Sequence, residues 1–350
     1  MSELEPNIEI FGELVAATKY GENPQQINAG IYKVEGGDPL AIHNYELVGG
    51  TAPSFNNYAD VDRLTLTTTM TAAGIDIHDL KTPFIAGAAK HGNACGFAIN
   101  ESPQQAVKDM LTGNPQAIFG GSVMLNFGVD AETAELLIKY DVNSGNRLLD
   151  SVIASEFSEE ALDTLSRKGG KLRTLANSAL ASLDRNSVDT SPRIRPVRGG
   201  FMQQDNYKAI DLKSLELELR KQGPEASQQQ IADMVLAWAI GSTSNSNTVT
   251  LVKNGQLIGN GVGQQDRVSV AKIAVEKAHE MGHDTENATA YSDSFFPFPD
   301  GAEVLIDAGV KAILTSSGSV RDDIVFAAFE NAGATIYAVR DAKARGFFGH

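Results

Sequence analysis

The chain has 350 residues, of which 42% are apolar and 21% charged, and its formal net charge at pH 7 is −15. This length and composition predict one large domain or two ordinary ones around a sizeable core. Acidic residues spread along the whole chain argue against a general nucleic-acid surface or anionic-membrane surface. They do not exclude a local basic pocket for a small anion.

The sequence holds one cysteine, Cys95, so no disulfide can form within the chain. The acidic segment 1–6 lacks the apolar core of a signal peptide. No apolar run approaches the length of a membrane-spanning helix. We therefore expect a soluble cytoplasmic protein with neither nucleic-acid nor membrane partners.

Helical periodicities alternate with short apolar runs, a pattern that favours an α/β fold. The predicted helices are 60–73, 103–112, 131–140, 158–168, 226–240, 266–281, 300–308 and 320–331. The predicted strands are 83–90, 95–99, 116–125, 151–154, 197–203, 248–252, 256–260, 311–315 and 334–338. The polar segment 184–195 interrupts both periodicities and predicts a boundary. The expected division is a lead-in (1–18), a first subdomain (19–190) and a second subdomain (191–350).

The first polar motif, 20–26, is rich in glycine, asparagine and proline and is typical of a turn. Lys19 and Tyr20 lie at its start and could hold a phosphate. The alternative is a turn without a ligand.

The most informative motif follows the apolar run 83–89. Lys90 and His91 stand at the end of this predicted strand, and the turn-forming residues Gly92 and Asn93 follow. A cation beside a base that titrates near neutrality is what acyl or formyl transfer needs. The alternative is a structural histidine at a strand end.

Three weaker motifs come next. Asp150 precedes a predicted strand, where an acid is usually a cap or a solvated residue. The segment 244–247 can orient a polar substrate or form a turn. The glycine-rich segment 259–267 leads into a helix and can present N–H groups to an anion, but it matches neither a dinucleotide-binding loop nor a P-loop.

The segment 292–300 places three phenylalanines around two prolines. It predicts either a core plug or an aromatic wall for a flat ligand, with Asp300 at the polar end. Further on, Ser319 is a predicted N-cap with Asp322 in the first turn of the helix. No zinc-deaminase motif is present, and the six histidines lack metal-ligand spacing, so no metal is expected.

The order of these motifs is more specific than any one of them. The chain resembles AICAR transformylase, the formyltransferase part of the bifunctional enzyme that ends the pathway to IMP, from about residue 19 to residue 350. The segments that carry the resemblance are YGENPQQ (20–26), KHGNACG (90–96), Phe119-Gly120-Gly121, Asp150, RGGFMQQD (198–205), SNSNTV (244–249), KNGQLIGNGVGQQDR (253–267), SDSFFPFPDG (292–301) and SSGSVRDD (316–323).

The resemblance implies transfer of a formyl group from the co-substrate 10-formyltetrahydrofolate to the 5-amino group of AICAR, giving FAICAR and tetrahydrofolate. It implies two duplicated, zinc-free, cytidine-deaminase-like subdomains in an intertwined homodimer with active sites at the subunit interface. The family's IMP cyclohydrolase domain has no room before residue 19, so we expect a separate cyclohydrolase to act downstream. Two alternatives are a related formyltransferase with a changed acceptor or donor and a non-catalytic ligand-binding paralogue.

By matching position, the resemblance implies that Lys90 stabilises the transition state, His91 accepts the proton of the attacking amine and Asn247 orients the substrate. The implied substrate-binding residues are Lys19, Tyr20, Phe119, Gly120, Asp150, Phe295 and Arg345. The implied folate-side residues are Arg267, Val268, Asp300, Ser319 and Val320.

This chain departs from the family pattern at several positions. Lys19 stands where the family has arginine, Ala94 where bacterial members have proline, and Asn245 where they often have lysine. The family's C-terminal, phosphate-binding arginine matches Arg345 only with a gap, and Arg340 is the alternative.

Overall fold

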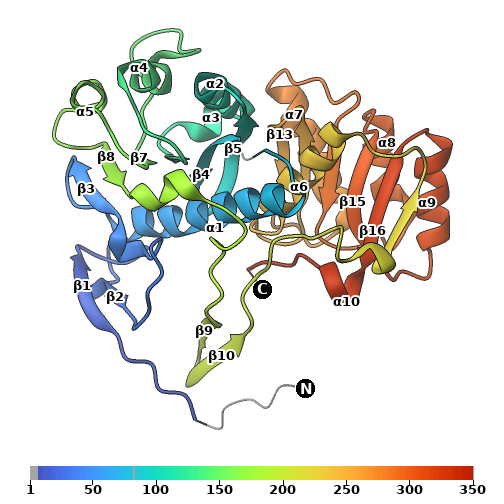
Figure 1. The fold of residues 1–350 in the computed structure, drawn as a ribbon, viewed down its shortest axis with the longest axis horizontal. Coiled ribbons are helices and arrows are strands. Elements are labelled where there is room, and N and C mark those ends of the chain that lie inside the picture. The colour runs from blue at the N-terminus through green and yellow to red at the C-terminus, as the bar shows by residue number, and fades with distance from the viewer. Residues whose placement is uncertain (1–6, 82, 350) are drawn as a thin grey trace.

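The computed structural model describes residues 7–81 and 83–349, and the lead-in residues 1–6 lie outside them. In the described part a twelve-stranded mixed sheet runs in the order β11-β16-β15-β14-β12-β13-β5-β4-β6-β7-β8-β3 (Figure 1). Its strands are β3 (Glu46–Gly49), β4 (Phe84–Lys90), β5 (Asn93–Asn100), β6 (Ser122–Leu125), β7 (Ser151–Ala154), β8 (Arg173–Ala176), β11 (Leu219–Gln222), β12 (Val249–Lys253), β13 (Gln256–Gly261), β14 (Thr289–Ser292), β15 (Ala312–Ser317) and β16 (Thr335–Arg340).

Two ribbons lie apart from this sheet: β1 (Glu13–Thr18) with β2 (Ala29–Lys33), and β9 (Arg193–Val197) with β10 (Gly200–Gln204). Both extend from the same side of the molecule, at the bottom of Figure 1. The segment predicted as a lead-in thus contains strand β1.

The sheet consists of two halves with the same topology. One half has the order β5-β4-β6-β7-β8-β3 and the other β13-β12-β14-β15-β16-β11. In each half the first strand pair is antiparallel, the three strands after the hairpin are mutually parallel, and the outermost strand is antiparallel. The halves meet at the antiparallel pair β5–β13, where Gln256 lies opposite Ala98.

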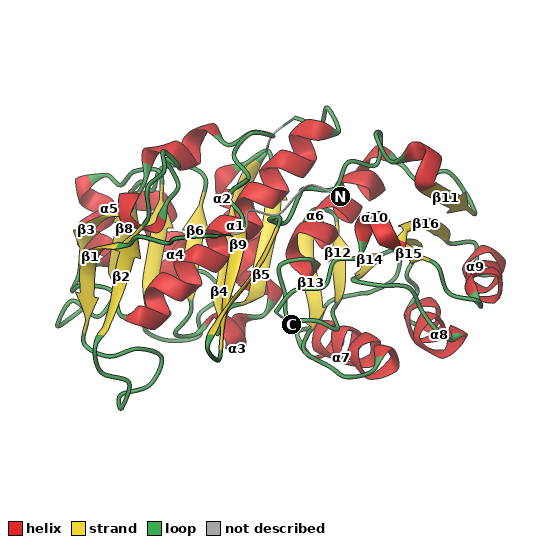
Figure 2. Cartoon of the chain, turned by 90° about the horizontal axis from the view of Figure 1, so that it is seen from below, coloured by secondary structure: helices red, strands yellow, loops and turns green. Residues whose placement is uncertain are grey.

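Helices cover both faces of the sheet (Figure 2). One face carries α1 and α6 over a core that extends across both halves, and the other carries two separate cores under α2, α4 and α5 and under α7, α8 and α9. The helices are α1 (Phe55–Ile77), α2 (Pro103–Gly113), α3 (Pro115–Ile118), α4 (Ala131–Lys139), α5 (Glu159–Leu165), α6 (Gln228–Gly241), α7 (Arg267–Glu280), α8 (Pro299–Asp307), α9 (Asp322–Asn331) and α10 (Asp341–Ala344). Among the described residues, none of these combines the length and the hydropathy needed to cross a membrane.

Helices α1 and α6 begin in the same way. Ser54 accepts the N–H of Asn57, and Ser227 accepts the N–H of Gln230, while each amide side chain bonds back to the cap residue. These capping boxes satisfy N–H groups that the first helical turn leaves unpaired. The capping box at Ser54 starts α1 before the predicted span 60–73, and the helix also ends after it, at Ile77.

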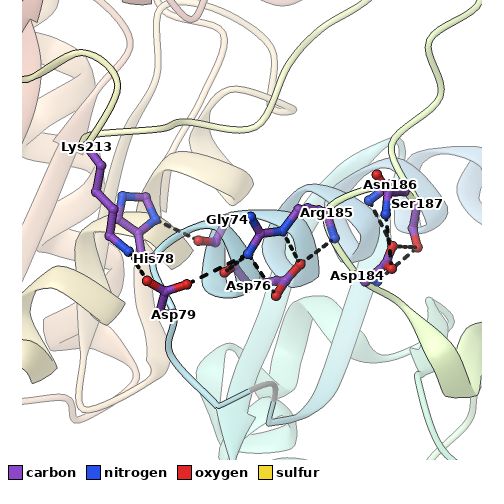
Figure 3. Close-up of polar contacts among 9 residues, drawn as sticks. All are labelled: Gly74, Asp76, His78, Asp79, Asp184, Arg185, Asn186, Ser187 and Lys213. Atoms are coloured by element: carbon purple, nitrogen blue, oxygen red, sulfur yellow. Dashed lines mark hydrogen bonds and ion pairs between the residues drawn. The ribbon is translucent and has the colours of Figure 1, made fainter.

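The segment between the halves is fastened to the C-terminal end of α1 (Figure 3). The Nε of Arg185 lies 2.7 Å from the carboxylate of Asp76, and an Nη lies 3.8 Å from Asp79. Asp79 also pairs with Lys213 at 2.5 Å. The C-terminal end of α1 thus binds both Arg185 and Lys213, which lie 28 residues apart in the connecting chain.

Two strand predictions were wrong. The predicted strand 197–203 is a hairpin, because Arg198 and Gly199 form the turn between β9 and β10. The predicted strand 116–125 begins as α3, because Asn114 caps a helical turn that starts with Pro115, and only its last residues form β6.

Candidate active site

Lys90 and His91 lie at the tight turn of the β4–β5 hairpin. Lys90 is the last residue of β4 and pairs with Asn93, so His91 and Gly92 form a two-residue loop. Both loop residues have positive φ, 53° and 70°, which is the geometry of a type I′ turn. His91 is exposed and Lys90 is half-buried. The two side chains stand at a strand end, where the sequence predicted them.

Three further predicted residues of the first half, Phe119, Gly120 and Asp150, lie beside this turn. The Nζ of Lys90 donates to the backbone oxygen of Phe119 at 2.6 Å. The Cα of Gly120 comes close to the same ammonium, because a Cβ on that glycine would lie 3.8 Å from it. Asp150 follows on the neighbouring strand edge and donates its N–H to Gly121. The chain therefore gathers Lys90, Phe119, Gly120 and Asp150 at one edge of the sheet.

A residue that the sequence analysis missed holds this turn. The Oδ1 of Asp60, on α1, accepts the N–H of Gly92 at 3.1 Å, and Oδ2 accepts the hydroxyl of Ser122 at 3.4 Å. Burial raises the pKa of this carboxyl, and these hydrogen bonds and the charge of His91 lower it less. Asp60 therefore ties helix α1 to the turn that carries His91.

A cleft of about 250 Å³ opens beside the turn, lined by Lys90, His91, Asn114, Asn260 and Lys277, among others. Lys277, also unpredicted, donates to the backbone oxygen of Asn260 at 2.9 Å, and desolvation lowers the pKa of its ammonium. Burial raises the pKa of the Cys95 thiol to about 12. A thiol whose pKa is raised in this way is a poor nucleophile at neutral pH.

The second half contributes a cluster around Arg267, the first residue of α7. Its Nη2 donates to the side-chain oxygen of Asn247 at 2.9 Å, and its Nη1 forms an ion pair with the buried Asp293. The other carboxylate oxygen of Asp293 accepts the hydroxyl of Ser246. The amide nitrogen of Asn247 donates to the backbone of Gln264 at 2.8 Å. Both ends of the Asn247 amide are therefore fixed.

Hydrogen bonds connect these two groups of residues within one chain. The N–H of Asn245 donates to the side chain of Asn93 at 3.1 Å, and the amide of Asn260 donates to the backbone of Ala94 at 3.2 Å. Across the described residues, no hydrogen bond joins His91 directly to Asn247. The turn and the Asn247 segment are therefore joined through Asn93 and Asn245, not through the side chains of His91 and Asn247.

The phenylalanine-rich segment divides between core and surface. Phe296 is buried under α8, as a core plug would be, and Phe298 is exposed with the guanidinium of Arg321 over its ring at 4.3 Å. Phe295 is half-buried beside Gly318. Asp300 is exposed in the first turn of α8.

The Ser319 segment differs from its prediction. Helix α9 begins at Asp322 with Arg321 at the cap position, so the predicted N-cap at Ser319 is wrong. The carboxylate of Asp322 instead accepts the N–H groups of Gly318 and Ser319, at 2.7 and 3.1 Å. Val320 is fully exposed, and Val268 is half-buried in the first turn of α7.

The two candidate C-terminal arginines both have carboxylate partners. Arg345 forms an ion pair with Asp341, four residues earlier. Arg340 lies 3.0 Å from Glu218. Each ion pair uses one nitrogen of a guanidinium whose side chain is largely exposed.

Lys19 and Tyr20 follow strand β1. The turn after them closes through a hydrogen bond from Gly21 to Gln26, and Asn56 at the start of α1 donates to Glu22. Within residues 7–81 and 83–349, no hydrogen bond or ion pair links Lys19 or Tyr20 to the Lys90 turn. The same residues contain no group of three or more His, Cys, Asp and Glu side chains that could hold a metal ion.

The chain belongs to the AICARFT/IMPCHase bienzyme family, whose model matches residues 2–277. It is 36% identical over 312 residues to the bifunctional purine biosynthesis protein PurH of Oceanobacillus iheyensis, covering 89% of this chain and 55% of that protein. It is 34% identical to PurH of Mycobacterium marinum over 325 residues, covering 92% and 56%, and 30% identical to PurH of Persephonella marina over 320 residues, covering 91% and 57%. The chain thus spans a little over half the length of these relatives.

Among solved structures, RibD of Acinetobacter baumannii matches with a TM-score of 0.24 and 20% identity, covering 34% of this chain and 37% of that one. A likeness of this size carries no conclusion about fold or activity.

Proposed function

We propose that this chain is a cytoplasmic AICAR formyltransferase, which transfers the formyl group of 10-formyltetrahydrofolate to the 5-amino group of AICAR. The observation that carries the proposal is the Lys90–His91 turn, with Lys90 held by a backbone carbonyl and His91 exposed at the mouth of a cleft. Membership of the AICARFT/IMPCHase bienzyme family supports the proposal.

His91 serves as the general base. The 5-amino group is conjugated to its ring and is a poor nucleophile, so its proton must leave as the nitrogen attacks the formyl carbon. An imidazole is half-protonated near neutral pH and can accept that proton. The neighbouring carboxylate of Asp60 favours the imidazolium that results, because opposite charges attract.

Lys90 serves as the electrophilic stabiliser. Attack forms the new C–N bond and moves the carbonyl electrons to the formyl oxygen, and the ammonium can stabilise that negative charge. The intermediate then collapses, the bond to the folate N10 breaks, and N10 takes up a proton. Asn247 would orient the acceptor, since both ends of its amide are fixed by Arg267 and Gln264.

The remaining site residues extend this proposal. Phe119, Gly120 and Asp150 would line the acceptor site at the turn, with Tyr20 and Phe295. Arg267, Val268, Asp300, Ser319 and Val320 would form the folate side, where the first turn of α7 and the Phe295 corner come together. No metal is required by this chemistry.

We further propose that the two halves are the duplicated, cytidine-deaminase-like subdomains of the family and that the chain forms an intertwined homodimer. The identical strand order of the halves supports the first point. The second is supported by exposed apolar side chains on or next to the two ribbons, including Tyr32 and Val34 on one and Phe201 and Met202 on the other. Isolated monomers rarely expose such a set.

A steady-state assay of the purified chain tests the activity, with AICAR and 10-formyltetrahydrofolate as substrates and the purine product identified. We expect FAICAR and tetrahydrofolate in equal amounts. IMP would show that cyclohydrolase activity is also present, and a faster acceptor than AICAR would favour a related formyltransferase. Binding of AICAR without turnover by any formyl donor would favour a ligand-binding paralogue.

A further inference from the structure

The imidazole of His91 has no hydrogen bond of its own. Across residues 7–81 and 83–349, neither ring nitrogen of His91 has a hydrogen-bond partner, and its backbone oxygen accepts the side-chain amide of Asn93 at 3.2 Å. The side chain is exposed, so packing does not fix it either. The position of the ring therefore depends on the backbone of the two-residue turn that carries it.

Asp60 bonds this backbone from outside the hairpin. Its Oδ1 accepts the N–H of Gly92 at 3.1 Å, and that N–H belongs to the peptide group that joins His91 to Gly92. A Cβ on Gly92 would also lie 3.8 Å from an Nη of Arg63, but this guanidinium donates its hydrogen bond to the backbone oxygen of Thr243. The peptide group that follows His91 is thus held from α1 by the carboxylate of Asp60.

The second oxygen of the same carboxylate connects Asp60 to two strands of the sheet. Oδ2 accepts the hydroxyl of Ser122 at 3.4 Å, and the Oγ of Ser122 accepts the hydroxyl of Ser151 at 2.6 Å. Both serines are buried, and they are the first residues of β6 and β7. Ser151 directly follows Asp150. A continuous row of hydrogen bonds therefore runs from the His91 turn through Asp60 to the strand that begins beside Asp150.

Asp233, which supports the turn between β12 and β13 from helix α6, lacks this second connection. Its two carboxylate oxygens both serve the turn, where they accept backbone N–H groups at 2.7 and 3.0 Å. Thr289 begins β14 as Ser122 begins β6, and within the described residues its buried hydroxyl has no hydrogen-bond partner. Asp233 therefore supports a turn alone, whereas Asp60 connects a turn to the neighbouring strands.

Two charged members of the candidate site act on Asp60. Burial raises the pKa of its carboxyl, and the hydrogen bonds from Gly92 and Ser122 lower it. In addition the charge of His91 lowers this pKa, and the charge of Asp150 raises it. Asp60 is thus coupled to the turn and to the strand edge by charge as well as by hydrogen bonds.

We propose that Asp60 is a positioning residue, which holds the His91 turn in one orientation relative to the strand edge that carries Asp150. The inference rests on the role of general base proposed for His91. A general base must lie within hydrogen-bond reach of the proton that it accepts, and a misplacement of about 1 Å can cost about 100-fold in rate. Because the His91 ring has no hydrogen bond of its own, this precision has to come from the support of the turn.

Steady-state kinetics of full-length variants test this proposal. Asp60→Ala removes both acceptor oxygens, and we expect kcat for formyl transfer to fall about tenfold or more. The KM for AICAR should stay within about threefold, because the lost interaction orients the base and does not bind the substrate. Asp60→Asn keeps an oxygen that can accept the Gly92 N–H, so kcat should recover to within about threefold of the native value. The matched control Asp233→Ala should lower the melting temperature and leave kcat unchanged.

A second measurement does not depend on turnover. In NMR spectra of the histidine-labelled chain, the ring signal of His91, assigned by its loss in His91→Asn, should shift or broaden in Asp60→Ala. It should be unchanged in Asp233→Ala and close to native in Asp60→Asn.

The proposal is overturned if Asp60→Ala leaves the His91 signal unchanged, or if an active chain keeps its kcat in that variant. It is also overturned if Asp233→Ala lowers kcat as much as Asp60→Ala does, or if Asp60→Asn recovers nothing, since the charge of Asp60 would then matter and not its hydrogen bonds. A displaced His91 signal in Asp60→Ala, in a chain that transfers no formyl group, would keep the positioning role and reject the proposed activity.

Discussion

The hairpins β4–β5 and β12–β13 occupy equivalent places in the two halves, and their turns read Lys90-His91-Gly92-Asn93 and Lys253-Asn254-Gly255-Gln256. In both hairpins the lysine ends the first strand and the next two residues have positive φ. In both, the register of the strand pair shifts directly after the second residue pair from the turn. The backbone of the candidate active site is therefore present twice.

The supports of the two turns also correspond. Asp60 and Asp233 each lie five positions after the first residue of their helix, and each accepts backbone N–H groups of its turn. On the second strand, Gly96 and Gly259 each allow a helix carbonyl so close that a Cβ would overlap it. Both turns have these supporting contacts, so the contacts alone do not distinguish the candidate active site from the second turn.

The difference lies in two side chains. Lys90 donates to a backbone carbonyl and keeps its net charge, whereas Lys253 is neutralised by the carboxylate of Asp284 at 2.8 Å. The second turn has Asn-Gly, the preferred type I′ pair, but the first has His-Gly. Asparagine is the preferred residue at this position of a type I′ turn, so the catalytic role proposed for His91 would give a reason for a histidine there.

Converting the first turn into the second should have the largest effect. His91→Asn keeps the type I′ turn but removes the base, so we expect kcat to fall about 100-fold or more. The melting temperature should stay the same or rise. Initial rates and thermal unfolding, with Asn254→Ala as the control, measure both. A variant that retains most of its activity would reject His91 as the base.

Neutralising the two lysines should separate their roles. Lys90→Gln removes the stabilising charge, and we expect kcat to fall about 100-fold. Lys253→Gln should leave kcat unchanged and shift the unfolding midpoint little, because Lys253 pairs with an exposed carboxylate. Equal losses of activity in the two variants would contradict the distinction between the turns.

Filling the two glycine positions should affect both halves alike. Gly96→Ala and Gly259→Ala each drive a methyl group into a helix carbonyl, of Met110 and Ala274 respectively. Overpacking of this kind costs about 1–3 kcal/mol. Urea unfolding followed by circular dichroism gives the value, and a large loss at one glycine alone would show that the halves are supported differently.

The smallest effect concerns the two buried aspartates. Burial raises the pKa of Asp60 and of Asp233 above the ordinary value of 3.8. A raised carboxyl pKa contributes stability that is present below the unfolded value and lost as pH rises through the folded value. The advantage of the native chain over Asp233→Asn should therefore shrink between acid and neutral pH. An advantage that grows instead would show that the folded pKa is lowered.

Helices with strong end signals could be predicted closely from the sequence. The predicted helix 103–112 ends one residue before α2 does, and in the structure α2 has Ser102 as its N-cap and Pro103 as its first residue. The strands β1, β2, β3, β8 and β11 were missed, since they are four to six residues long and none is fully buried. Strands this short carry little hydrophobic pattern of their own.

From the residues alone, the candidate site could be predicted only where its members are neighbours in sequence, and Phe119, Gly120, Asp150 and Asn247 came from the resemblance to a family. Lys90 and His91 stand out locally, but Asp60, Arg63 and Lys277 reach the site from other helices through tertiary packing. One sequence signal was available for Asp60. The pattern Ser-x-x-(Asn/Gln)-x-Ala-Asp occurs at 54–60 and again at 227–233, a repeat too widely spaced to be found by searching short periods.

The antiparallel contact between β5 and β13 resembles the way in which two separate half-length chains would join edge to edge. In such a pair of identical chains, any substitution would change both turns at once, so a base gained at one would be forced on the other. A single covalent chain removes that restriction. One half can keep the asparagine that suits its turn while the other half carries a histidine. A scaffold with two similar halves can then carry the proposed general base at only one of its two turns.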